Sequence, residues 1–254
     1  MASRRSAGTV LPALALTLNA FVWGVSWWPF RELQGYGVHP LWATALVYIT
    51  SLALLLAWKP SAWRGFSDQP LLWLLLVAAG LTNVGFNWAV TVGDVVRVVL
   101  LFYLMPAWTV ILAWPILGER PTAVSLLRLA LALTGVAVVL NTGDSPWPVP
   151  EGVADWLALM GGLSFALTNI LLRKLHRASA PSRILAMFGG GALLASAAAV
   201  AGMALGLVTA PPAPQLGWAG VGLALSLGFL ASNVALQYGA SRMNAHAGAL
   251  IMLS

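Results

Sequence analysis

The 254-residue chain contains no cysteine, and charged residues make up only 8% of it. Without cysteine there is no disulfide framework, no thiolate metal site and no thiol nucleophile. Soluble domains carry roughly a quarter of their residues as Asp, Glu, Lys and Arg. With 60% hydrophobic residues and so few charges, the composition indicates a membrane protein.

Several chemical motifs are also missing. No Gly-Lys-Ser/Thr phosphate-binding loop is present, so we do not expect ATP hydrolysis. No Asp or Glu lies in the middle of an apolar stretch, and no Ser/His/Asp set or histidine cluster is placed for catalysis within a membrane. We therefore expect no cofactor and no metal, and favour a protein that is not an enzyme. A membrane-embedded enzyme remains the alternative from a different functional class.

The Lys and Arg residues that are present alternate along the chain. Cytoplasmic loops of membrane proteins retain Lys and Arg, whereas translocated loops do not. Of the 13 basic residues, all but Arg31 and Arg97 fall on one set of alternate gaps: Arg4, Arg5, Lys59, Arg64, Arg120, Arg128, Arg173, Lys174, Arg177, Arg183 and Arg242. The other gaps hold five of the seven acidic residues, namely Glu32, Asp94, Asp144, Glu151 and Asp155. This predicts a multi-pass protein of the cell inner membrane with a cytoplasmic N-terminus.

The net charge of +6 follows from these basic inner loops, so it does not indicate nucleic-acid binding. The partners that we expect are a small-molecule substrate and membrane lipids, with no nucleic acid. Nothing in the sequence requires more than a monomer.

Apolar stretches long enough to cross a bilayer recur along the chain. A spanning helix needs about 20 apolar residues. Eight complete spans are predicted, at about 9–30, 40–58, 70–92, 96–117, 122–140, 153–172, 183–208 and 215–238. A ninth begins near Asn244 and is incomplete at Ser254. The fold class predicted from these stretches is an all-α polytopic membrane protein.

The two halves of the chain resemble each other. Trp23-Gly24-Val25-Ser26 aligns with Phe165-Ala166-Leu167-Thr168, and Asn87-x-Ala89-x3-Gly93 matches Asn233-x-Ala235-x3-Gly239. Five predicted helices precede the second half, an odd number, so the second half enters the membrane in the opposite orientation. Inverted repeats of this kind are a common plan of secondary transporters. We predict a first repeat over residues 1–141, a periplasmic linker over 142–152 and an incomplete second repeat over 153–254. Ten helices are expected, of which about nine are present in a truncated chain.

Two short motifs resemble a known family. Leu101-Phe102-Tyr103-Leu104-Met105-Pro106, followed by Leu117-Gly118-Glu119-Arg120, is similar to the fourth helix and following turn of EamA-type bacterial members of the drug/metabolite transporter superfamily. Residues 129–140 and 249–254 resemble further helices of that family. The resemblance implies export of amino acids or related metabolites by alternating access, with the aromatic amino-acid exporters as the best-described branch. Carriers of drugs, nucleotide-derived compounds or lipid precursors remain alternatives.

Amide side chains are the main polar groups predicted at bilayer depth. Polar side chains are costly there and are therefore functional candidates. Asn83 and Asn87 share a face of the third span, Asn169 lies in the sixth, and Asn233 and Gln237 share a face of the eighth. Asn83, Asn87, Asn169 and Gln237 are the candidate substrate ligands of this kind. The alternative is that these amides only bond across helices.

Aromatic side chains form a second group of candidates, namely Trp23, Trp27, Tyr103, Trp108 and Phe165. Aromatic faces in a central cavity would stack apolar or aromatic substrates and attract an ammonium group. We take Trp23, Trp27, Tyr103 and Phe165 as candidate substrate-binding residues. The alternative is that they face lipid or pack in the core.

Three further features bear on mechanism and packing. His246, at the start of the ninth span, is a candidate binding residue and can take a proton at physiological pH, although a structural hydrogen bond is the alternative. Pro106 is predicted to kink the fourth span. Two pairs of small residues at four-residue spacing predict close helix packing: Ala186 with Gly190, and Gly202 with Gly206.

Overall fold

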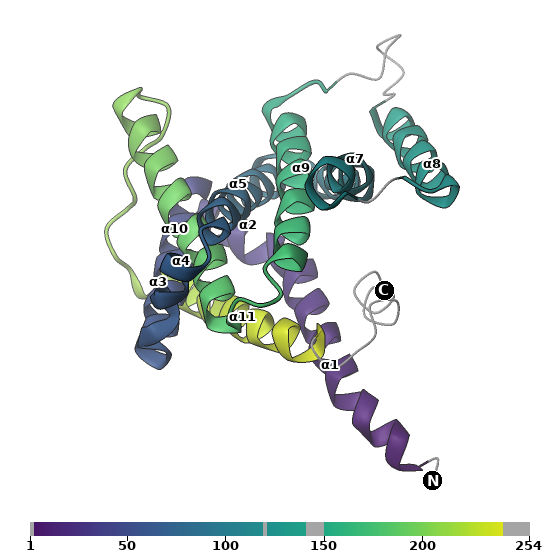
Figure 1. Cartoon of the computed structure of the whole chain (residues 1–254). Coiled ribbons are helices and arrows are strands. Elements are labelled where there is room, and N and C mark those ends of the chain that lie inside the picture. The colour runs from purple at the N-terminus through teal and green to yellow at the C-terminus, as the bar shows by residue number, and fades with distance from the viewer. Residues whose placement is uncertain (1–2, 119–120, 141–149, 241–254) are drawn as a thin grey trace.

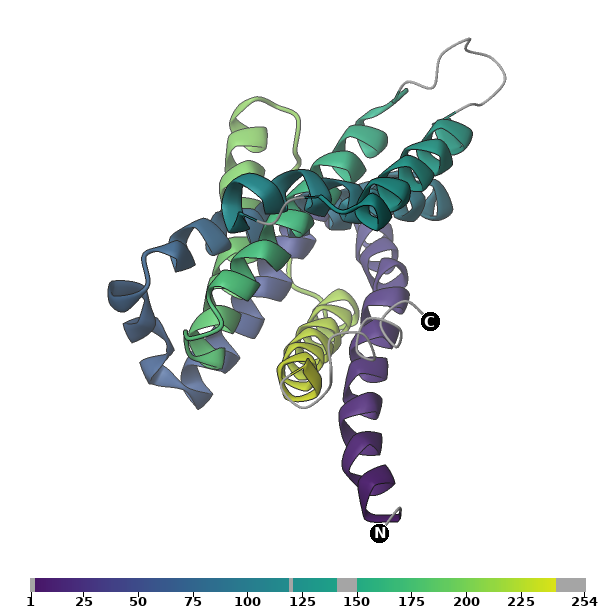
Figure 2. The same ribbon diagram turned by 45° about the vertical axis from the view of Figure 1, so that its right-hand side comes forward.

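The structure, a computed structural model, describes residues 3–118, 121–140 and 150–240, and these contain helices but no strand (Figures 1 and 2). The helices are α1 (Ser3–Val25), α2 (Trp27–Gly35), α3 (Pro40–Trp58), the 3-10 helix η1 (Pro60–Arg64), α4 (Gly65–Asp68), α5 (Leu71–Val92), α6 (Val95–Phe102), α7 (Met105–Leu117), α8 (Ala123–Leu140), α9 (Val153–Lys174), α10 (Ala180–Ala204) and α11 (Leu216–Ala240). Seven helical segments among the described residues are long and apolar enough to cross a membrane. The prediction of an all-α polytopic membrane protein is confirmed.

The predicted spans correspond to helices wherever the structure describes them. α8 occupies the place of the fifth predicted span, and the other seven match the membrane-spanning segments. The ninth predicted span, which includes His246, and residues 141–149 of the linker region lie outside the described residues.

Two of the spans are interrupted. α6 ends at Phe102 and α7 begins at Met105. Pro106 has no N–H to donate to the carbonyl of Phe102, which explains the break, and the chain passes from α6 to α7 through a tighter turn in which Leu104 N–H donates to the carbonyl of Leu101 and Ala107 N–H to that of Leu104. The first span is also irregular, at Ser26 between α1 and α2, where the N–H donates to the carbonyl three residues back although φ and ψ stay helical at −64° and −26°. That second break was not predicted.

The two pairs of small residues have different roles. Gly190 lies where α10 crosses α5, and a Cβ atom there would collide with the backbone of Leu76 and Gly80. Ala186 is buried on the same face, so close packing is confirmed for this pair. For Gly202 and Gly206 the prediction of helix packing is wrong. Gly206 adopts a φ of 71°, and the Leu207 N–H donates to the Gly202 carbonyl over 2.8 Å, so these glycines end the helix.

Helix α5 lies at the centre of the packing. It contacts α9 on one side and α10 on the other, and α3 packs against α10. Figure 1 shows this order, with α7 beside α9 and α8 at the right-hand edge of the view. Helix α1 packs along α11, and its N-terminal part extends beyond the other helices in both views.

The packing of α1 and α9 agrees with an internal symmetry. In the predicted repeat the pairs α1–α11 and α9–α5 are equivalent, and both are extensive contacts. A Cβ atom on Gly93 would meet Ala154, and one on Gly239 would meet the side chain of Leu16 and the carbonyl of Pro12. Gly93 aligns with Gly239, and Ala154 aligns with Pro12, so the two crossings use equivalent positions. This supports the inverted repeat, whose limits stay a prediction.

Contacts between helix ends agree with the predicted alternation of sides. On the predicted inner side, Ser182 Oγ donates to the carbonyl of Ala62 over 2.7 Å, and Lys174 Nζ lies 3.4 Å from the carbonyl of Ile116. On the predicted outer side, Arg97 pairs with Asp155. None of these contacts joins an inner end to an outer one. Which side is cytoplasmic stays a prediction from the charges.

Candidate substrate site between two interrupted helices

The α6–α7 break brings backbone close to the second half of the chain. Gly162 of α9 lies against the carbonyl of Phe102, and a Cβ atom at Gly162 would come within 2.7 Å of that oxygen. Because Pro106 cannot donate to the same oxygen, the carbonyl is not held in a regular helix bond. Interrupted helices that expose backbone carbonyls form the binding sites of many transporters.

The α1–α2 break lies beside Trp23. Ser26 is buried, and its Oγ donates to the carbonyl of Trp23 over 2.8 Å while its N–H donates to the same oxygen over 3.3 Å. The hydroxyl therefore satisfies a carbonyl at the end of α1 and stabilises the interruption there. The indole of Trp23 is the large side chain at this break that faces the protein interior.

A continuous series of aromatic rings connects the two breaks. Trp23 stands edge-on to Phe86 with centroids 6.3 Å apart, Phe86 lies 4.7 Å from Phe102, and Phe102 lies 5.4 Å from Phe165. Trp23 also stacks on Phe229 of α11 at 4.8 Å with 20° between the planes. The series thus joins both breaks to helices of the second half. It also joins Trp23 to Phe165, which the repeat predicts to be equivalent.

On the far side of Phe229 the series meets polar groups. Tyr48 lies 5.6 Å from Phe229, and its hydroxyl donates to Asn83 Oδ1 over 2.7 Å. One turn along α5, Asn87 is fully buried and its Nδ2 lies 3.4 Å from Thr44 Oγ1. Asn87 Oδ1 has no hydrogen-bond partner among the described residues. A buried acceptor without a donor is costly, so this oxygen is a candidate ligand for a donor group of a substrate.

The structure brings the side chains of Trp23, Asn83, Asn87 and Phe165 to this region, whereas Trp27 and Tyr103 lie at the two breaks with their side chains turned out of the protein interior. Trp27 and Tyr103 are exposed, with 36% and 49% of their surface accessible. Trp27 lies under the guanidinium of Arg31.

Two more of the predicted residues contribute nothing to this cluster. Gln237 lies near the predicted inner end of α11, where Arg183 Nη2 donates to its Oε1 over 2.9 Å. Asn169 is half-buried on α9. His246 is outside the described residues.

Four aromatic residues of the site were not predicted from the sequence, namely Tyr48, Phe86, Phe102 and Phe229. Each looks like an ordinary apolar residue of a spanning helix. Their positions did carry a signal, because Phe86 adjoins Asn87 and Phe229 precedes Asn233 by one helical turn. Arg183 was also missed, because its charge was counted only toward sidedness.

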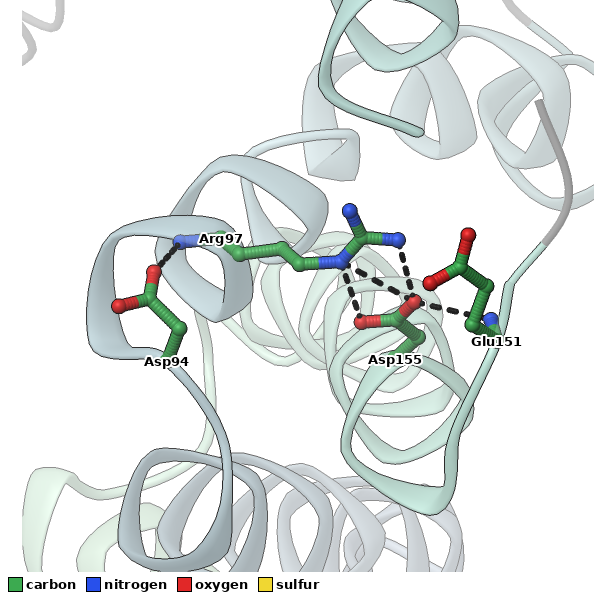
Figure 3. Close-up of polar contacts among 4 residues, drawn as sticks. All are labelled: Asp94, Arg97, Glu151 and Asp155. Atoms are coloured by element: carbon green, nitrogen blue, oxygen red, sulfur yellow. Dashed lines mark hydrogen bonds and ion pairs between the residues drawn. The ribbon is translucent and has the colours of Figure 1, made fainter. Parts of the chain in front are cut away.

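Two arginines depart from the alternation of charge, and both are compensated. Arg31 donates to the carbonyls of Val90 and Gly93 at the C-terminal end of α5, where a helix carries partial negative charge. Arg97 donates to the carboxylate of Asp155 from Nε over 3.0 Å and from Nη2 over 2.7 Å (Figure 3).

The carboxylate of Asp155 has a second donor. It also accepts the N–H of Glu151 over 3.1 Å. The ion pair therefore links α6 of the first half to α9 of the second at their predicted outer ends.

An apolar groove runs along α11 apart from the aromatic series. Its volume is about 510 Å³, and it is lined by Trp58, Leu227, Leu230, Ala231, Val234, Ala235 and Tyr238. None of the candidate substrate ligands lines it. The groove is therefore separate from the site between the interrupted helices.

The all-α polytopic fold and the paired helix irregularities are features that secondary transporters share. The sequence model of the EamA-like transporter family matches residues 10–141. The chain belongs to this family.

A curated relative supports the same assignment. The chain is 28% identical over 177 residues to an uncharacterised transporter of Pseudomonas aeruginosa. The aligned part covers 66% of this chain and 57% of that protein, so the chain spans little more than half of the relative's length.

Proposed function

We propose that the protein is a secondary transporter that exports small organic solutes, amino acids or related metabolites, across the bacterial inner membrane by alternating access. The observation that carries this proposal is the aromatic series between the two helix breaks, next to the buried amides. Membership of the EamA-like family supports the transport function. The charge alternation supports a cytoplasmic N-terminus, and with it the assignment of each helix end to the cytoplasmic or the outer side.

The chemistry of the site favours a solute with a flat apolar body and a polar end. The rings of Trp23 and Phe229 are stacked. Hydrogen-bonding groups come from Tyr48 on α3 and from Asn83 and Asn87 on α5. This chemistry supports our proposal that the solute is an aromatic amino acid, as in the branch of aromatic amino-acid exporters. Trp23 and Phe229 come from different halves of the chain, so rocking of the halves would separate the rings and admit a solute between them.

Counterflow in proteoliposomes tests this proposal. Vesicles preloaded with phenylalanine or tryptophan should accumulate the labelled solute. Trp23→Ala should reduce the rate about five- to thirtyfold, since losing one stacking face costs roughly 1–2 kcal/mol. Trp114→Ala is the matched control, because Trp114 is 59% exposed on α7. Equal rates in both variants would remove the aromatic series from the site.

The same vesicles distinguish the alternatives. Counterflow of a nucleoside, a cationic dye or a lipid precursor, without counterflow of amino acids, would assign a different solute class. Chemical conversion of any of these compounds without movement across the membrane would instead indicate a membrane-embedded enzyme.

A further inference from the structure

Among the described residues, Arg183 is a cation without an anionic partner. It is the fourth residue of α10, and its Nη2 donates to the neutral Oε1 of Gln237 over 2.9 Å. Its Nε is buried and has no hydrogen-bond partner among the described residues. No described carboxylate lies within ion-pair distance of this guanidinium.

Comparison with Arg97 shows what is missing. At Arg97 the Nε and Nη2 groups form one edge of the guanidinium, and both donate to the carboxylate of Asp155. At Arg183 only one of these two donors has a partner among the described residues. Nη2 donates to Gln237 Oε1, and Nε has no described acceptor. An amide oxygen thus occupies one of the two positions that a carboxylate fills at Arg97.

Neither helix stability nor sidedness accounts for this arrangement. A cation in the first turns of a helix is unfavourable, because the N-terminal end carries partial positive charge. The positive-inside pattern needs only charges at the surface, which the exposed Arg173 and Arg177 already provide. Arg183 is partly buried, and no counter-charge is found among the described residues. Partial burial of an unpaired arginine costs stability, so such a residue is a candidate for ligand binding.

We propose that the Nε–Nη2 edge of Arg183 binds the carboxylate of the transported solute at the predicted cytoplasmic end of α10 and α11. The carboxylate replaces Gln237 Oε1 on Nη2 and supplies the acceptor that Nε lacks. The amide nitrogen of Gln237 is then available to donate to the same carboxylate. This inference rests on the proposed function and narrows its substrate class to solutes that carry a carboxylate.

The planar fork of arginine suits this ligand. Two parallel N–H groups match the two oxygens of a carboxylate, and such charge-assisted pairs are about twice as strong as neutral hydrogen bonds. A phosphate oxygen of a lipid headgroup offers similar chemistry, so the experiment must separate a solute carboxylate from a headgroup.

The test measures binding to the purified chain in a neutral detergent, by the shift in melting temperature with matched ligands. The pairs are phenylacetate with phenylacetamide, and phenylalanine with phenylalaninamide. We expect the carboxylates to bind and Arg183→Gln to weaken them about ten- to a hundredfold, since a hydrogen-bonded charge pair is lost. Arg177→Gln is the control, because Arg177 is exposed on the same predicted side.

A second variant tests the geometry without removing the arginine. Gln237→Glu places a carboxylate beside Arg183 and should recreate the pairing seen at Arg97. It should raise the melting temperature without ligand and weaken the binding of both carboxylates as strongly as Arg183→Gln does. Unchanged carboxylate binding in Gln237→Glu would overturn the inference.

The remaining outcomes also decide the question. Binding of carboxylates and carboxamides with equal affinity, or of neither carboxylate, would overturn the inference. So would a difference between wild type and Arg183→Gln that appears only in nanodiscs containing phosphatidylglycerol and not phosphatidylcholine, because the ligand would then be a headgroup. Counterflow of neutral solutes in any of these cases would leave the proposed transport function standing.

Discussion

The ion pair between Arg97 and Asp155 gives a quantitative prediction about how the two halves are held together. The side chains are 21% and 7% exposed, so the pair lies between the surface and buried limits. Exposed pairs contribute about 0.2–1 kcal/mol, whereas removing one partner of a buried pair costs about 3–5 kcal/mol. For Asp155→Asn we expect an intermediate loss of about 1–3 kcal/mol.

A double-mutant cycle measures the pair itself. Unfolding of Asp155→Asn, Arg97→Gln and the double variant should be followed by denaturant titration in the same detergent. We expect a coupling free energy of about 1–3 kcal/mol, because each single variant leaves a partly buried group without its partner. In thermal melting, each kcal/mol corresponds to about 2–4 °C for a chain of this size.

The control for loss of an acidic charge is Glu32→Gln, because Glu32 is exposed on the same predicted side. This variant should change stability by less than about 0.5 kcal/mol. A coupling free energy below about 0.5 kcal/mol, which is the usual error of additivity, would show that Arg97 and Asp155 do not hold the halves together.

Three further predictions concern packing, sidedness and coupling. Gly162→Ala should destabilise the protein by about 1–3 kcal/mol, because the added Cβ would lie 2.7 Å from the Phe102 carbonyl, whereas Gly135→Ala, with open space around it, should be neutral or stabilising in the same unfolding assay. In this cysteine-free background, an impermeant thiol reagent applied to intact cells should label Glu32→Cys and not Lys174→Cys, and the reverse pattern would invert the topology. Counterflow should persist when the proton gradient is collapsed, because no Asp or Glu lies mid-span in this chain, and its complete loss would point to a proton-coupling group not considered above.

The sequence predicted the spans well because their signal is local. A stretch of apolar residues must be helical in lipid, since every backbone group needs an internal partner. The break at Pro106 was predictable for the same reason, because proline removes one of those partners wherever it occurs. The break at Ser26 has no such residue. It depends on a hydroxyl that bonds to the carbonyl of Trp23, and serine is also common in unbroken membrane helices.

The candidate site was only half predicted because it depends on contacts between distant residues. Asn83 and Asn87 stand out in an apolar helix, so composition alone made them candidates. Phe86, Phe102 and Phe229 do not stand out, and their importance lies in the rings that they contact across four helices. Gln237 was predicted to join the same region, yet its partner among the described residues is Arg183, near the predicted inner ends of α10 and α11.

The arginines show why a charge pattern must be interpreted together with contacts. Arg31 and Arg97 look anomalous in the sequence, and the structure compensates both, one with helix-end carbonyls and one with a carboxylate. Arg183 looks ordinary, because it follows the positive-inside rule, but among the described residues its guanidinium bonds to a neutral amide and to no carboxylate. In a transporter the counter-charge of such a residue can be supplied by the cargo. The residue that fits the sequence rule is therefore the better candidate for substrate binding than the two that break it.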